Sequence, residues 1–345
     1  MPEQADEGWI LCLRIWCLWL VVTIWWSSAL HMNDHTVFSP SLYHDCIAFA
    51  NESCGQKCDW TLFYAGKGAF HADILACDII FSYLCIMKKV VVVIPIYKKE
   101  LGEYERISVS RTCKVLGAHD IVVVHPEGLD IRIISKKYPE LKFHSFHSRF
   151  FKGIMGYNRL MMSEEFYSAF EAYEYILICQ TDAYVFSDRL EEWCEAGYDY
   201  VGAPWLRKPV YNLPIIRQWV ALSTWISHKK GQRSRRDLYG KVGNGGLSLR
   251  RVASHLDVLR KESEKIAPYV NRSEKCHLYN EDVFWAVEPD NFKYPSVEDA
   301  LRFSFDKYPS LAFKLTNGEL PMGCHAWWKR KMRRFWLRTK PEMFP

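Results

Sequence analysis

The sequence predicts an α/β fold with a mostly parallel central sheet for the part of the chain that follows residue 86. Two observations support this prediction. Short apolar runs rich in β-branched residues recur in this part, and segments of helical length separate them. Such runs are typical of strands that are buried on both faces, and their alternation with helices implies right-handed crossovers between parallel strands.

The expected elements can be placed in chain order. The predicted strands cover residues 90–96, 121–124, 141–143 and 175–179. The predicted helices cover residues 103–116, 130–137, 158–173 and 214–227. After residue 200 the pattern becomes irregular, and 228–236 (HKKGQRSRR) is expected to be a basic, mobile loop.

Composition favours a globular protein, with 49% hydrophobic and 25% charged residues. Residues 1–86 contain three basic and nine acidic residues, whereas the remainder has 42 basic and 31 acidic residues, a net charge of +11. A basic domain suits phosphorylated or anionic ligands. Five cysteines are scattered singly after residue 86 without a CxxC pair, which favours free thiols in a reducing, cytoplasmic compartment over a disulfide or zinc framework.

The first 86 residues are predicted to be an extension, or a mis-assigned start, outside the folded domain of residues 87–345. Residues 9–30 form an apolar stretch long enough to span a bilayer, and the chain is a single-pass membrane protein if this stretch is native. No flanking Lys or Arg orients it. Lys88 and Lys89, followed by a hydrophobic strand, resemble the beginning of a cytoplasmic protein.

The carboxyl ends of the predicted parallel strands are expected to carry the binding site, because ligands of open α/β sheets bind at that edge. Pro95, Tyr97 and Glu127 fall there. Asp182 also falls there, directly after an apolar strand. As a hard oxygen ligand, Asp182 is a candidate to bind a divalent cation against ligand phosphates. The alternative is that Asp182 caps the turn that precedes Ser187.

A glycine-rich turn opens the segment GNGGLSLR at residues 243–250. Its glycines permit a close approach of ligand to backbone, and Asn244 offers hydrogen bonds to hydroxyl groups. Asn244, Gly245 and Gly246 are therefore candidates for binding an acceptor molecule. The alternative is an ordinary tight β-turn.

Two later motifs complete the set of candidates. Glu281 and Asp282 enter an apolar, helical stretch, where either acid could act as a general base or simply favour a helix N-terminus. His325 lies among small and aromatic residues, where a neutral imidazole could complete a metal site or could be a core residue.

Taken together, these motifs resemble a family catalogued as a domain of unknown function and grouped with GT-A glycosyltransferases. The matching pieces are VVVVIPIYKKEL, HPEGLD, GYNRLMMSEEFY, YILICQTDAYVF, GYDYVGAPW, VGNGGLSLR, NEDVFW and PMGCHAWWK. The resemblance implies a GT-A-like fold and transfer of a hexosyl or related sugar from a nucleotide-sugar donor to a hydroxyl of a glycan or lipid-linked acceptor. It also implies a divalent cation, manganese or magnesium.

The resemblance assigns roles to particular residues. It implies that Asp182 takes the place of the usual DxD aspartate, although the sequence offers Thr-Asp-Ala and hence a single carboxylate. His325 would join it at the metal. NEDVFW resembles the Glu-Asp-Val segment of inverting galactosyltransferases, which favours Asp282 over Glu281 as base. Asn158 and Arg159 are further donor-site candidates, and Trp205 is a further acceptor-site candidate.

Two other function classes stay open. Another nucleotide-using transferase should show a glycine-rich phosphate loop after the first strand, whereas residues 94–100 (IPIYKKE) contain none. A non-catalytic glycan-binding or membrane-associated protein could retain the fold without turnover. Residues 329–338 mix cations with Phe335 and Trp336, which suits either a dock on anionic lipid or a solvated helix face packed by its aromatics. Nucleic acid is not an expected partner.

Overall fold

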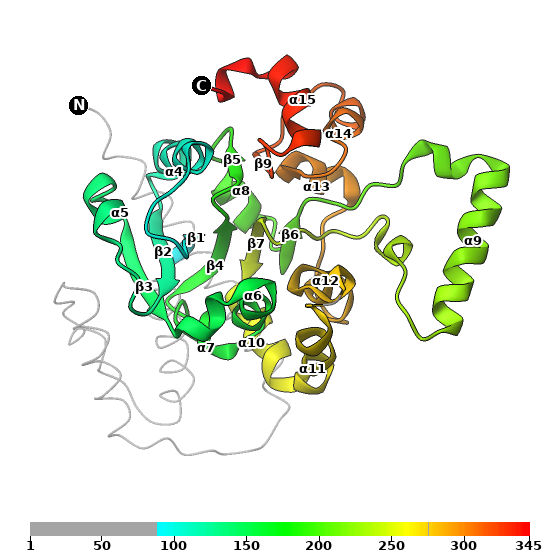
Figure 1. The fold of residues 1–345 in the computed structure, drawn as a ribbon, viewed down its shortest axis with the longest axis horizontal. Coiled ribbons are helices and arrows are strands. Elements are labelled where there is room, and N and C mark those ends of the chain that lie inside the picture. The colour runs from blue at the N-terminus through cyan, green and yellow to red at the C-terminus, as the bar shows by residue number, and fades with distance from the viewer. Residues whose placement is uncertain (1–87, 275) are drawn as a thin grey trace, which may run out of the picture. The chain divides into compact units, whose positions relative to one another are not determined.

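The computed structural model describes residues 88–274 and 276–345, which fold into a large sheet and a small sheet surrounded by helices (Figure 1). The predicted extension and its apolar stretch at residues 9–30 lie outside the described residues. Within the described part, no helix has both the length and the apolar character needed to cross a membrane.

The large sheet has six strands in the order β3-β2-β1-β4-β7-β6. The four strands β1 to β4 run parallel, whereas β7 is antiparallel to both of its neighbours. The predicted α/β class with a mostly parallel sheet is therefore confirmed. The carboxyl ends of β1 to β4 and the start of β7 share one edge. The strands are β1 Lys88–Pro95, β2 Asp120–Pro126, β3 Lys142–Phe146, β4 Tyr173–Cys179, β6 Tyr200–Gly202 and β7 Leu247–Arg251.

The first half of the chain follows the predicted elements closely, with one exception. A single helix was expected over residues 158–173, and this expectation was wrong. The chain forms α6, ends it at Met161, and starts the separate helix α7 after Ser163, whose hydroxyl accepts the N–H of Phe166 at 3.3 Å. Tyr173 then pairs with Lys88 as the first residue of β4.

Further helices fill the region after residue 200, where loops were expected. The helix predicted over residues 214–227 forms as α9, and its last turn takes in part of the expected basic loop. The helices are α4 Glu103–Leu116, α5 Arg132–Lys137, α6 Gly153–Met161, α7 Glu164–Ser168, α8 Leu190–Glu195, α9 Pro214–Lys229, α10 Val252–Lys261, α11 Ser263–Arg272, α12 Glu281–Val287, α13 Val297–Phe303, α14 Pro309–Leu315 and α15 Arg330–Thr339.

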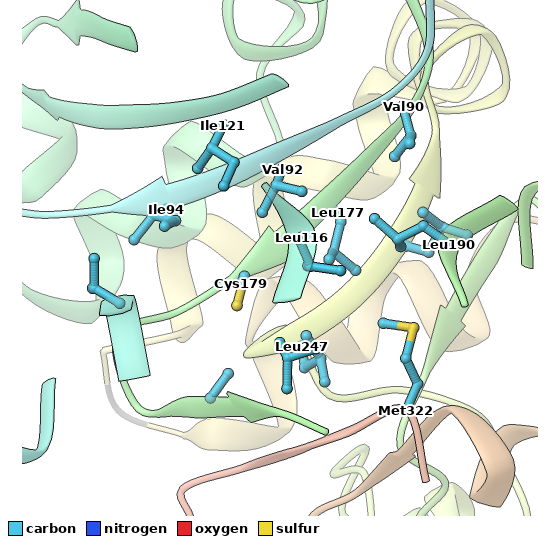
Figure 2. Packing of buried hydrophobic residues seen from close by; sticks show 14 of the residues in the cluster. Val90, Val92, Ile94, Leu116, Ile121, Leu177, Cys179, Leu190, Leu247 and Met322 are labelled. Carbon is cyan, nitrogen blue, oxygen red and sulfur yellow. The ribbon is translucent and has the colours of Figure 1, made fainter. Parts of the chain in front are cut away.

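Both faces of the large sheet are buried along its central strands β2, β1, β4 and β7, whose alternate side chains point to opposite sides. In β1, Val90, Val92 and Ile94 pack on one face, where they meet Leu116 of α4 and residues of neighbouring strands (Figure 2). Val91 and Val93 pack on the other face against α6, α7 and α12. This two-sided burial explains the continuous apolar run in the sequence.

The small sheet holds three short strands in the order β5-β9-β8. They are β5 Ala183–Val185, β8 Ser304–Phe305 and β9 Gly323–His325. Ala183 pairs with His325 across an antiparallel ladder, and β8 runs parallel to β9. Two residues that flank these strands, Asp182 before β5 and Asp306 after β8, consequently lie at the same end of the sheet as His325.

Candidate functional site

The end of the small sheet carries a cluster of charged side chains. His325 lies between two carboxylates, with its Nε2 3.1 Å from Oδ1 of Asp182 and its Nδ1 3.3 Å from Oδ1 of Asp306. The second oxygen of Asp182 contacts Nζ of Lys329 at 2.6 Å. The Asp182 and His325 side chains are each 15% exposed, so the cluster is largely buried but open to a ligand. The structure thus brings together two of the predicted residues, 143 positions apart in the chain.

The charges of this cluster stabilise one another. Burial opposes the charged form of His325, but the carboxylates of Asp182 and Asp306 outweigh it and raise the pKa of His325 to about 10. Burial would likewise raise the pKa of Asp182, yet His325 and Lys329 hold that pKa well below its usual range. The pKa of Asp306 is also lowered, because His325 outweighs the effect of its burial. Without a ligand, the imidazolium of His325 and the ammonium of Lys329 balance the negative charges of Asp182 and Asp306.

The Asp182–His325 pair fits a divalent cation. The buried Nε2 of His325 has no hydrogen-bond partner although it lies 3.1 Å from the Asp182 oxygen. Two donor atoms that each bind a cation at about 2.1 Å and roughly at right angles lie about 3 Å apart. Asp306 contacts the other ring nitrogen, Nδ1, in the way that carboxylates commonly contact a metal-binding histidine. Across the described residues, no group of three or more acidic, His or Cys side chains is arranged to hold a metal.

The glycine turn at residues 243–246 lies directly against this cluster. The carbonyl of Gly246 accepts the N–H of Gln180, which joins the turn to the end of β4. A Cβ on Gly246 would stand 2.2 Å from Nε2 of His325, and a Cβ on Gly245 would stand 2.0 Å from Oε1 of Glu281. These two glycines are therefore required by the close approach of candidate site residues, because any side chain would displace them.

The polar groups of the turn are largely used within it. Asn244 has a φ of 83°, and its Oδ1 accepts the N–H of Gly246 at 3.1 Å. The ring of Trp205 packs so closely on Gly243 that a Cβ there would stand 2.0 Å from it. Acceptor binding by Asn244, Gly245, Gly246 and Trp205 stays a prediction, and the structure adds that Trp205 lies beside the turn.

Glu281 and Asp282 are adjacent at the start of α12 but face different surroundings. Glu281 is buried and pairs with the fully buried Arg250 at 2.9 Å. Burial raises the pKa of Glu281 to about 7, although Arg250 opposes the rise. Asp282 is only partly buried. Burial raises the pKa of Asp282 too, and Lys307 and Asp306 are near enough to influence it.

The predicted donor-site residue Asn158 lies inside the protein and fixes the start of α12. Its Oδ1 accepts the N–H of Glu281 at 3.1 Å, and its Nδ2 donates to Oδ1 of Asn280 at 3.3 Å. Only 2% of Asn158 is exposed. This geometry indicates that Asn158 positions the two acids of α12, while a direct contact with the donor stays a prediction.

The other donor-site candidates lie near the expected edge of the sheet. Pro95 ends β1 and pairs with Val124, Tyr97 is 60% exposed just beyond it, and Glu127 follows β2 on the surface. Arg159 is exposed on α6. None of these four residues forms a hydrogen bond or an ion pair with Asp182, and their roles stay predictions.

The C-terminal basic segment forms α15. Trp336 is fully buried and Phe335 packs beside it against α14, whereas the arginines of the helix face outward. Of the two interpretations of this segment, the structure favours a solvated helix face packed by its aromatics. Trp336 is buried and Phe335 is partly buried, so residues 329–338 lack the exposed aromatic side chains expected of a segment that docks on a lipid surface.

Three residues of the site were not singled out from the sequence. Asp306 follows the apolar run FSF much as Asp182 follows its strand, and this similarity could have identified Asp306 as a site residue from the sequence. Lys329 and Arg250 are the cations that balance Asp182 and Glu281. Nothing in the local sequence distinguishes these two cations from the many other basic residues.

The fold and the candidate site define an α/β protein in which a carboxylate, an imidazole and a glycine turn lie together at the ends of strands. A family described as protein of unknown function (DUF5672) matches residues 140–325, and the chain belongs to this family. This result confirms the resemblance seen in the sequence motifs.

Comparison with solved structures gives glycosyltransferases. The galactosyltransferase LgtC, solved in complex with donor and acceptor sugar analogs, has 14% identity and a TM-score of 0.46 over 73% of this chain and 94% of its own. The glycosyltransferase GlyE of Streptococcus pneumoniae TIGR4 has 13% identity and a TM-score of 0.40 over 73% of this chain and 60% of its own. No curated protein matches the sequence. Likeness at this level assigns no residue a role.

Proposed function

We propose that the chain is a glycosyltransferase with a GT-A-like fold that moves a sugar from a nucleotide-sugar donor to a hydroxyl of a glycan or lipid-linked acceptor. The observation that carries the proposal is the Asp182–His325 pair, which stands at strand ends beside a glycine turn, with a lysine in contact with the carboxylate. Edges of α/β sheets of this kind bind ligands. The motif resemblance directs the choice of reaction.

Asp182 and His325 are the residues that would hold a manganese or magnesium ion. When bound, such an ion neutralises the charge that develops on the departing nucleoside diphosphate. Asp306 keeps the imidazole of His325 oriented through Nδ1. The Lys329 side chain is 61% exposed and is therefore free to leave Asp182 and contact a donor phosphate instead.

Asp282 is the better candidate for the general base. A base must reach the acceptor hydroxyl and must be able to take up its proton. Glu281 is sealed inside the protein by Arg250, whereas Asp282 is partly exposed next to Asp306 and Lys307. Burial raises the pKa of Asp282, which strengthens it as a proton acceptor. The structure therefore favours the same residue as the motif resemblance.

The test is donor hydrolysis and transfer by the purified chain with a panel of nucleotide-sugars, with and without manganese. We expect release of nucleoside diphosphate with one class of donor and loss of this release in Asp182→Asn. Tight donor binding without any hydrolysis or transfer would support the non-catalytic alternative. Release of pyrophosphate from a nucleoside triphosphate would support another nucleotide-using transferase.

A further inference from the structure

Helix α9 presents its apolar side chains to solvent. Trp219 is 69% exposed and Ile215 is 73% exposed, and Leu222 and Ile226 lie on the same stripe at helical spacing. Trp225 is 54% exposed next to this stripe. A surface helix normally turns such a stripe toward the core, and α9 does the opposite.

The other side of α9 makes its contacts with the protein. Ser223 and Thr224 both accept hydrogen bonds from Nη1 of Arg236, with 3.3 Å to Thr224 Oγ1. Ile216 and Val220 are partly covered on this side. The helix is held on two extended connections away from the sheets (Figure 1). These polar contacts join α9 to the connection that follows it, and no side chain of α9 is buried by the described residues.

Charge in the segment around α9 is predominantly positive. Residues 207–236 contain eight Lys and Arg and no Asp or Glu. Two acids outside this stretch pair with it: Asp237 is bound to His228 at 3.0 Å and to the N–H of Ser234, and Glu288 forms an ion pair with Arg233. The ammonium of Lys229 lies 4.5 Å from the ring centre of Trp225, so cations and exposed aromatics share one surface.

We propose that this surface, formed by Ile215, Trp219, Leu222, Trp225 and Ile226 with the surrounding cations, docks on an anionic phospholipid bilayer. Exposed tryptophans and aliphatic side chains flanked by Lys and Arg are the composition of helices that lie in the membrane interface. The 16 residues of α9 extend about 24 Å, which is shorter than the roughly 30 Å of a hydrocarbon core, so α9 lies along the membrane and does not span it.

A second copy of the chain is a poorer occupant. A symmetric contact through α9 would bring the basic residues of both copies together, and among the described residues only Arg233 of the eight cations has an acidic partner, Glu288. An anionic bilayer supplies the missing negative charge and accepts the apolar stripe at once. Helix α15 shows the contrast, because it is basic too but its Trp336 is buried.

The test uses the full chain and flotation with vesicles of phosphatidylcholine alone or of equal parts phosphatidylcholine and phosphatidylglycerol. We expect binding to the anionic vesicles, at least tenfold weaker binding for the combined Trp219→Glu and Trp225→Glu variant, and unchanged binding for Ile133→Glu. Ile133 is the matched control because it is 53% exposed on the short helix α5. All variants retain residues 1–87, so a difference between them reports α9.

A second variant tests the charges. Combining Lys229→Gln with Lys230→Gln should weaken binding about fivefold per cation at low salt, and the difference should disappear in high salt. Equal binding to neutral and anionic vesicles, or unchanged binding of the tryptophan variant, overturns the proposal. The proposal is also overturned if the tryptophan variant changes from dimer to monomer while its vesicle binding stays the same. The measurement requires no turnover and is independent of the proposed enzymatic activity.

Discussion

Two acid–base clusters lie next to each other at the glycine turn and differ in what balances the acid. Asp182 is paired with His325 and Lys329, and Glu281 is paired with Arg250. The Lys329 side chain is 61% exposed, whereas that of Arg250 is fully buried. In each case a carboxylate is largely removed from water and requires a positive partner.

The difference shows which carboxylate can serve a ligand. The ammonium of Lys329 can move into solvent at little cost, because exposed ion pairs contribute little to stability. Asp182 can therefore exchange this partner for a cation or a phosphate-bound metal. Arg250 cannot leave Glu281 without exposing two buried charges, so Glu281 is held as part of the structure. This interpretation makes predictions that separate the two clusters.

The largest effect is expected for Asp182→Asn. Loss of the carboxylate removes a proposed cation ligand, and metal stabilisation of a leaving group is worth several kcal/mol, so turnover should fall by about a thousandfold or more. Thermal unfolding should change little, because the fold does not depend on a replaceable ion pair. Steady-state kinetics at saturating manganese and a melting curve decide this. Normal turnover in the variant would remove Asp182 from the catalytic centre.

The next effect concerns Asp282. If this carboxylate takes the acceptor proton, Asp282→Asn should lower kcat by about a hundred- to ten-thousand-fold. Donor affinity should remain near that of the wild type, since Asp182 and His325 are untouched. Donor titration and turnover measured on the same preparation separate the two quantities. Loss of both together would point to a role in donor or metal binding instead.

Arg250→Met should act on stability. The substitution leaves the buried carboxylate of Glu281 without its cation, and we expect a loss of about 3 kcal/mol in the free energy of unfolding above pH 7, where Glu281 is ionised. The measurement is denaturant unfolding, with Arg272→Met on the solvated side of α11 as control. An unfolding free energy equal to the wild type would show that Glu281 does not depend on Arg250.

The same pair predicts a pH dependence. Arginine keeps its proton throughout the neutral range, so Glu281 is the member that titrates. Burial raises its pKa from the usual 4.5 to about 7, so the folded state binds this proton more tightly than the unfolded state. Stability from this group is present below pH 4.5 and is lost as the pH rises towards 7. This slope of unfolding free energy with pH should be absent in Glu281→Gln.

Sequence reasoning placed the sheet edge correctly because strand periodicity is a local property. It also selected Asp182 and His325, since their motifs follow or end apolar runs. It did not find Asp306 or Arg250, because their roles depend on pairings between distant strands, such as β8 with β9 and β4 with β7. The residues alone could not choose between Glu281 and Asp282, although the motif resemblance favoured Asp282, because adjacent residues of a helix point in different directions and only the fold shows which one meets Arg250.

The smallest effects on stability, and the sharpest comparison, come from two adjacent glycines. A Cβ on Gly245 meets Glu281, and a Cβ on Gly246 meets His325, each at about 2 Å. Overpacking typically costs about 1–3 kcal/mol. The sealed Glu281 has no room to move, so Gly245→Ala should show this loss in unfolding experiments. The ring of His325 is partly exposed and can turn away, so Gly246→Ala should keep most of its stability and lose manganese binding and turnover.

Both alanine variants can be made and measured in parallel, by denaturant unfolding and by titration with manganese in the absence of donor. Each glycine serves as the control for the other, because the two positions share the same turn, sheet edge and burial. Equal loss of stability in both, with no difference in manganese binding, would mean that the turn responds as one rigid unit. The two clusters would then be coupled. Substitutions at this turn could not distinguish Asp182, whose partner Lys329 is replaceable, from Glu281, whose partner Arg250 is not.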